Sequence, residues 1–170
     1  MANPTVFLIN SQTLSSSVSS VSFTSIPQTY TDLKIVYSAR DDQASTQDNV
    51  RMTFNGATSS YAQMAMYGYS GTAYGTSNTP AYLDYQYTTG NSAVGNTFSN
   101  TEIYIPNYAT ANNKTLSIES VSENNASSGV IILTAGSWAT TAAITTVTFV
   151  PVAGNFVANS TFYLYGIKNS

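Results

Sequence analysis

The chain has 170 residues, contains no histidine and no cysteine, and carries only five basic and eight acidic side chains. Without imidazole or thiol groups the usual proton shuttles, cysteine nucleophiles, disulfides and zinc ligands are excluded. A net charge of −3 with five dispersed basic residues offers no positive stripe for phosphates, so we expect no nucleic-acid partner.

A chain of this length can bury one core, and we predict a single β-domain over residues 11–170. Residues 1–10 form either an arm that reaches a neighbouring subunit or an ordinary first strand. The apolar run at residues 6–9 is too short for a signal sequence, and no run is long enough for a spanning helix. We therefore expect no membrane partner.

Apolar and polar residues alternate with a period of two along most of the chain, which predicts an all-β fold. In chain order the first expected strands are residues 5–9, 18–23, 33–40 and 49–54, the last ending at the turn dipeptide Asn55-Gly56. Short antiparallel strands separated by Gly, Asn, Ser and Pro clusters are typical of a β-sandwich or jelly roll. The later expected strands are residues 63–69, 81–87, 98–105, 115–121, 130–135, 144–150 and 161–167.

Two intervals interrupt this pattern and are predicted to be loops. Residues 41–48 are polar and hold several of the charges, which indicates an exposed loop. Residues 70–80 are mostly Gly, Ser and Thr around a single tyrosine. Either loop could be a contact tip.

Acidic residues in the first of these loops suggest one metal site. Asp41, Asp42 and Asp48, aided by Asn49 or Gln47, could ligate calcium through oxygen. The spacing matches no EF-hand, so a solvated loop with local ion pairs is the favoured interpretation, and we expect no cofactor. An acid/base pair for glycoside hydrolysis is less favoured still, because nothing hydrophobic nearby would raise one aspartate pKa.

Other enzyme signatures are missing. A serine nucleophile would need a Ser-Lys pair in a chain without histidine, and no Ser-x-x-Lys occurs. No phosphate-binding glycine motif occurs either. We expect no enzymatic activity and name no catalytic residues.

Tyrosine is the enriched residue type, with seven of the thirteen between positions 61 and 87. Tyrosine offers rigid contact area and a polar tip, which suits protein and sugar recognition. The alternative is that these rings simply cover a sheet, since tyrosine is a good strand former. Trp138 is expected in the core. The candidate interaction surface comprises Val6, Phe7, Tyr67, Tyr69, Tyr74, Tyr82 and Tyr85.

Three segments carry a resemblance to a known class of proteins. They are the run from Val21 to Arg40 (VSFTSIPQTYTDLKIVYSAR), the run from Val50 to Gly56 (VRMTFNG) and the closing FYLYGI that begins at Phe162. Together they resemble a signature of small virion proteins of tailed bacteriophages, including phages of cyanobacteria. The resemblance implies a single jelly-roll-type β-sandwich, no catalytic residues, synthesis in the host cytoplasm and a place on the virion.

The resemblance implies a structural role in the particle. We expect a capsid decoration (cement) protein that binds the major capsid protein on the outer surface of the head, because the chain has no segment for a fibre stalk. By analogy it is a homo-oligomer, with a trimer favoured. The alternative is the receptor- or glycan-binding head of a tail or head fibre, and a glycan-depolymerising enzyme is the remote third possibility.

Overall fold

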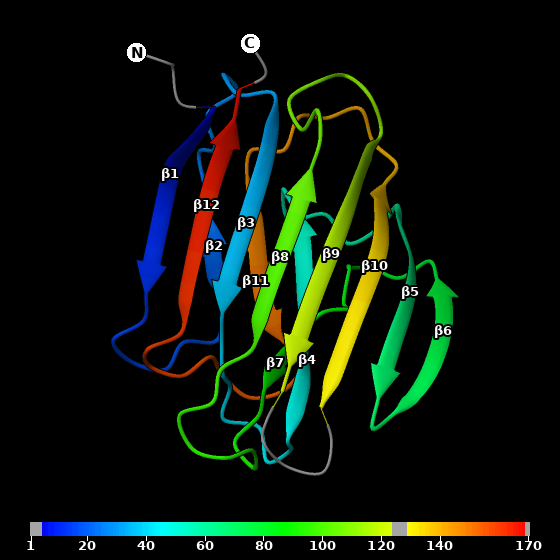
Figure 1. Cartoon of the computed structure of the whole chain (residues 1–170). Helices are drawn as coiled ribbons and strands as arrows, with labels where there is room; N and C mark the ends of the chain where they lie inside the picture. Colours follow the sequence, from blue (N-terminus) through cyan, green and yellow to red (C-terminus); the bar gives the residue numbers. More distant parts are fainter. Residues whose placement is uncertain (1–4, 124–128, 169–170) are drawn as a thin grey trace.

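The computed structural model describes residues 5–123 and 129–168, which form twelve strands and no helix. All strand pairs are antiparallel and belong to two sheets, as the period of two predicts. Figure 1 shows the larger sheet in front of the smaller one. No helix in these ranges is long and apolar enough to cross a bilayer.

Eight strands make the large sheet and four make the small sheet. In spatial order the large sheet contains β1 (Val6–Thr13), β12 (Thr161–Ile167), β3 (Asp32–Ser38), β8 (Asn100–Ile105), β9 (Lys114–Ser122), β10 (Val130–Trp138), β5 (Tyr61–Tyr69) and β6 (Thr72–Asn78). The small sheet contains β2 (Val21–Phe23), β11 (Val147–Pro151), β4 (Gln47–Phe54) and β7 (Tyr87–Thr89).

The core lies between the two sheets and is rich in aromatic rings. Tyr37 packs against Phe149 and Phe162 with ring centroids 5.6 and 5.3 Å apart. Trp138 is buried, as expected, and lies 5.6 Å from the ring of Phe54. Edge-on and tilted ring pairs of this kind add to the stabilisation that comes from burial alone.

Two buried cations fasten the loops to this core. The Arg40 guanidinium donates to the carbonyls of Asn91, Ala93, Val94 and Thr97 at 2.9–3.1 Å, so one side chain holds the loop after β7. Burial lowers the pKa of Lys114, whose Nζ donates to the Thr110 carbonyl at 2.7 Å. A buried cation is tolerated where carbonyl oxygens satisfy its donors.

Several predicted elements are confirmed, and two predictions are wrong. The strands expected at residues 33–40, 49–54 and 161–167 are present as β3, β4 and β12, and Asn55-Gly56 turns with φ of 51° and 69°. Residues 81–86 are not a strand, because the segment crosses from the large sheet to the small one and pairs with β4 through a bridge from Leu83 to Met52, before β7 begins at Tyr87. The loop predicted at residues 70–80 is mostly β6.

Both ends of the described chain lie at one corner of the large sheet (Figure 1). β1 pairs with β12 along its whole length, and the Lys168 amide donates to the Thr5 carbonyl at 2.9 Å. Of residues 1–10, for which an arm and a first strand were both open, residues 6–10 therefore lie within the chain's own sheet. Residues 1–4 lie outside the described ranges.

Candidate functional site: the outer face of the large sheet

The outer face of the large sheet exposes five large apolar side chains on adjacent strands. We call this set the apolar strip; it comprises Met64 and Met66 on β5, Ile131 and Leu133 on β10, and Val121 on β9. Register places Leu133 directly opposite Met66 and Ile131 directly opposite Val121. Met66 is 70% exposed and Ile131 is 62% exposed. Apolar side chains gathered in this way on a soluble surface mark a contact site more often than chance exposure does.

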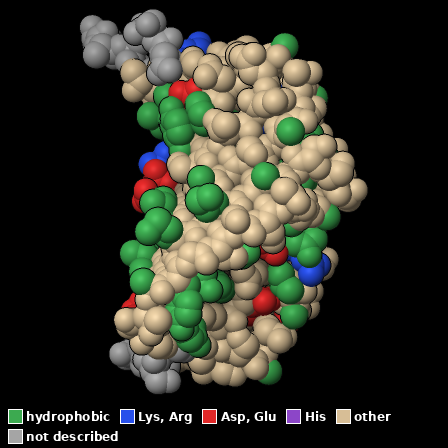
Figure 2. Space-filling model, turned by 90° about the vertical axis from the view of Figure 1, so that its right-hand side faces the viewer, with side chains coloured by type: hydrophobic (Ala, Val, Ile, Leu, Met, Phe, Trp, Pro, Cys, Tyr) green, Lys and Arg blue, Asp and Glu red, His purple; other side chains and the backbone are tan. Residues whose placement is uncertain are grey.

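Alternation within the strands explains why the strip faces outward. In β10 the side chains of Val130 and Ile132 point into the core, so Ile131 and Leu133 must point away from it. The same alternation sends Met64 and Met66 outward from β5. Figure 2 shows hydrophobic side chains gathered along its left-hand side, where this outer face is seen edge-on.

Small residues hollow the surface beside the strip. A depression of about 240 Å³ is lined by Met66, Gly68, Ala73, Tyr74, Ile131 and Leu133. Gly68 and Ala73 are register partners, and Gly75 is paired with Met66, so little side-chain volume stands between the longer apolar groups. The depression can receive an apolar side chain of a partner, and its opening is on the same face as the strip.

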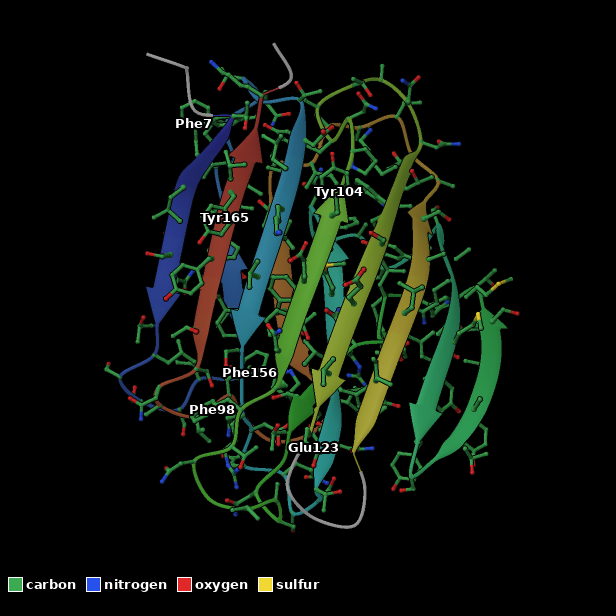
Figure 3. All side chains as sticks on the ribbon, viewed as in Figure 1. Phe7, Phe98, Tyr104, Glu123, Phe156 and Tyr165 are labelled. Atoms are coloured by element: carbon green, nitrogen blue, oxygen red, sulfur yellow. The ribbon has the colours of Figure 1, made fainter. Side chains whose placement is uncertain are left out.

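Charged and polar groups border the strip toward β3. Lys34 and Glu102 form an ion pair at 2.7 Å, and the Tyr104 hydroxyl donates to Asp32 at 2.6 Å. That hydrogen bond raises the pKa of Tyr104. In Figure 3 the labelled Tyr104 and Tyr165 both lie on this face of the sheet. The strip is therefore an apolar area with a polar margin, which is the usual anatomy of a protein contact.

The residues predicted from sequence as an interaction surface fall into three separate places. Tyr67 and Tyr74 stack with centroids 5.1 Å apart on the inner side of the β5–β6 hairpin, and the Tyr85 hydroxyl lies 3.0 Å from Thr76 Oγ1 beside them. Tyr69 is on the same side of β5, near the turn. Tyr82 lies instead under the Arg51 guanidinium, 4.6 Å from the ring centroid.

The two predicted residues near the N-terminus lie at the opposite edge of the sheet. Val6 is exposed on β1, and Phe7 packs against Tyr30 with a centroid distance of 5.7 Å. Phe7 is labelled near the chain ends in Figure 3, far from β5 and β6. Val6 and Phe7 therefore do not share a surface with the tyrosines.

The acidic segment at residues 41–48 is not simply an exposed loop. Asp41 is fully buried, and its Oδ2 has no hydrogen-bond partner among the described residues. Burial, with the charges of Asp48 and Asp42 beside it, raises the pKa of Asp41 to about 7. The expectation that nothing nearby would raise an aspartate pKa is therefore wrong, because the core itself covers this carboxyl group.

The other two aspartates of this segment are held by backbone amides. Asp42 accepts from the Asn155 amide at 2.7 Å, and Asp48 accepts from the Ala153 amide at 2.8 Å. Within residues 5–123 and 129–168 no group of three or more metal-ligating side chains has the arrangement that an ion needs. The geometry assigns these carboxylates to fastening the loop between β11 and β12.

Each of the five basic side chains has a partner within the protein. Lys34 pairs with Glu102, Arg40 and Lys114 hold carbonyl oxygens, and Arg51 covers Tyr82. Lys168 lies about 6 Å from the ring centroids of Phe7 and Tyr30. These cations belong to different parts of the surface and core and form no continuous positive stripe.

Sequence reasoning missed the apolar strip, although one signal could have found it. Four consecutive apolar residues, from Val130 to Leu133, cannot all face one core in an antiparallel strand that has a solvent side. Two of them must be on the outer face. In β5 the alternation points the other way, because Met64 and Met66 are more apolar than Gln63 and Ala65, which are the buried residues of this strand.

Comparisons of the chain with protein-family models, with curated proteins and with solved structures find no match.

Proposed function

We propose that this chain is a non-catalytic virion structural protein of a tailed bacteriophage, and that it decorates the capsid by binding the outer surface of the head. The observation that carries the proposal is the apolar strip, an exposed, uncharged set of large side chains on a regular sheet. The sequence resemblance supplies the class of particle, and the strip supplies the surface that would contact the major capsid protein.

The physical properties of the surface suit this role. A decoration protein ties neighbouring subunits together through contacts that are individually modest and repeated many times over the shell. An apolar strip with a polar margin gains free energy from burial without needing a matching charge on the partner. Low charge on the whole chain also limits repulsion between copies that are crowded on one particle.

The strand orders support a jelly roll with additions. The eight strands of a jelly roll, lettered B to I along the chain, lie in two sheets with the orders B-I-D-G and C-H-E-F. The small sheet has the order β2-β11-β4-β7, which corresponds to C-H-E-F, and the large sheet begins with β1-β12-β3-β8, which corresponds to B-I-D-G. In this assignment the additions are two hairpins, β5–β6 between strands E and F and β9–β10 between strands G and H, and both extend the large sheet beyond β8.

Binding to heads that lack their decoration tests the function. The purified chain should saturate such heads at symmetric positions and raise the temperature at which they break open. Replacing Ile131 or Leu133 with Asp should weaken binding about tenfold or more, because each side chain loses its apolar burial. Val152→Asp, at an exposed valine just after β11, is the control and should bind as the unchanged chain does. Equal binding by all variants would show that the strip is not part of the interface.

A second candidate is the receptor- or glycan-binding head of a fibre, and one observation favours it. The stacked rings of Tyr67 and Tyr74 remain partly exposed, and sugar rings bind on such aromatic surfaces. Under this alternative Tyr74→Ala and Tyr85→Ala abolish attachment to host cells or glycans, while Leu133→Asp leaves it unchanged. The opposite pattern, with head binding lost only in the strip variants, supports decoration.

A further inference from the structure

Among residues 5–123 and 129–168 the two sheets end in four edge strands, and one of these, β6, is open to another strand. β2 and β7 are three residues long, and β1 carries an irregularity between Leu8 and Asn10 that breaks its register. Short or bulged edges resist pairing with other chains. β6 has seven residues in unbroken register with β5, and its sequence TAYGTSN contains no charge and no proline.

The hairpin geometry identifies which backbone groups of β6 are unpaired. Ser70 and Gly71 form a two-residue turn with φ of 48° and 81°, as in a type I′ hairpin, so Tyr69 and Thr72 are the hydrogen-bonded pair that closes it. Hydrogen-bonded and non-hydrogen-bonded pairs alternate along an antiparallel ladder. The N–H and C=O groups of Ala73, Gly75 and Ser77 therefore point away from β5 toward solvent.

We propose that two copies of this chain join through their β6 edges in antiparallel register, with Gly75 on the twofold axis. Gly75 then exchanges both backbone hydrogen bonds with the partner's Gly75. Ala73 pairs with the partner's Ser77, and Tyr74 lies opposite the partner's Thr76. The two eight-stranded sheets become one continuous sheet.

A second copy fits this edge for three reasons. The free groups on Ala73, Gly75 and Ser77 are symmetric about Gly75, so the strand is complementary to itself. Neither strand brings a charge to the seam. On the outer side the seam is lined by small residues, which leaves room for the long Met66 side chains of both copies to cover it.

The contact rests on observations other than those behind the proposed binding to heads: it is made by the backbone of β6, whereas head binding uses the side chains of the strip, and the two surfaces adjoin at Met66. It also differs from the trimer that the sequence resemblance implies, because an isologous edge contact closes as a dimer. The mass in solution separates these possibilities. Light scattering and sedimentation over a range of concentrations should give a reversible monomer–dimer equilibrium for the purified chain.

A pair of matched double variants locates the contact at β6. In Tyr74→Lys with Thr76→Lys, each new lysine faces a lysine of the other copy in a close, non-hydrogen-bonded pair, and dimerisation should weaken about tenfold or more. In Tyr74→Lys with Thr76→Glu, each lysine faces a glutamate, and dimerisation should be retained. Both variants lose the same contacts to Tyr67 and Tyr85, so folding effects cancel in the comparison.

A single cysteine tests the register directly, because the chain has no other cysteine. A hydrogen-bonded antiparallel pair places its Cα atoms about 5.5 Å apart, within the range of a disulfide. Space is available at Gly75, where an added Cβ would lie 4.0 Å from the nearest atom, the Ala65 carbonyl oxygen. Gly75→Cys should cross-link to a dimer under mild oxidation, at least tenfold faster than the control Val152→Cys.

Three outcomes would overturn the proposal. They are a chain that stays monomeric up to millimolar concentration, a stable trimer unaffected by both double variants, and equal cross-linking of Gly75→Cys and Val152→Cys. A monomeric chain whose binding to heads is lost in the variant with two lysines would show that β6 receives a strand from the shell protein instead. Head binding by the strip would survive any of the first three results.

Discussion

Arg40 shows how one side chain can replace a hydrophobic anchor. Its guanidinium is buried and donates to four carbonyl oxygens of the loop at residues 91–97. The planar group presents several donors in a fixed geometry, which lysine cannot reproduce. The sequence placed Arg40 beside an exposed loop, and nothing in the spacing indicated that the side chain would turn inward.

Arg40→Lys and Arg40→Met should therefore both destabilise the fold, by about 2–4 kcal/mol, because buried carbonyl oxygens lose their donors. Urea denaturation measures the change. Lys34→Met is the control: its ion pair with Glu102 is partly exposed, so the loss should not exceed about 1 kcal/mol. Equal effects of the two sites would contradict the anchoring role of Arg40.

Asp41 gives the stability a pH dependence of unusual sign. Its pKa is raised to about 7 in the folded chain and is about 4 in the unfolded chain, so the folded state binds this proton more tightly. Stability from this group is complete below about pH 4 and is lost as the pH rises to about 7. Most carboxylates that accept hydrogen bonds in folded proteins act in the opposite direction.

The free energy of unfolding of the unchanged protein should fall by on the order of 2 kcal/mol between pH 4 and pH 8. This figure is smaller than the full pKa difference implies, because water near the neighbouring carboxylates screens part of the effect. Asp41→Asn should remove most of this decline, whereas Glu119→Gln on the outer face should preserve it. Urea midpoints at several pH values provide the measurement. A decline of equal size in Asp41→Asn would show that other groups are responsible.

At the scale of single elements, the strands with one buried face were predictable from the sequence, and the edge strand β6 was not. β3, β4 and β12 alternate apolar and polar residues, which is the pattern that burial on one face produces. β6 is largely exposed and carries one large side chain, Tyr74, among small and polar residues, so its sequence resembles a loop. Its strand conformation comes from the hairpin with β5, which local composition does not encode.

The β5–β6 hairpin depends on a single glycine at its turn. Gly71 has φ of 81°, where side chains other than glycine are strained, although an added Cβ would meet no atom within 4 Å. Gly71→Ala should destabilise the hairpin by about 1 kcal/mol, seen as faster hydrogen exchange of β6 amides. Gly75→Ala, in ordinary strand conformation with room for a methyl group, should change exchange little. Similar effects at both glycines would argue against turn strain as the cause.

For the molecule as a whole, composition predicted the fold class better than it predicted the contact surface. The absence of helical periodicity and the turn dipeptides indicated antiparallel sheets, and the structure has them. The clustered tyrosines, in contrast, lie in three different places in the fold: the β5–β6 hairpin, the ring under Arg51 and the core. The apolar strip depends on register between β9, β10 and β5, and register is a long-range property that periodicity within one strand does not reveal.

The adjacency of Thr5 and Lys168 at one corner has a practical consequence for engineering this protein. A short linker could join these two positions, and the chain could be reopened at the Ser70-Gly71 turn to give a circular permutant with the same sheets. Passenger domains fused beyond either position would leave from the β1 side of the molecule, at the far edge of the sheet from β6. Cargo could then be attached while the strip and the open edge stay accessible.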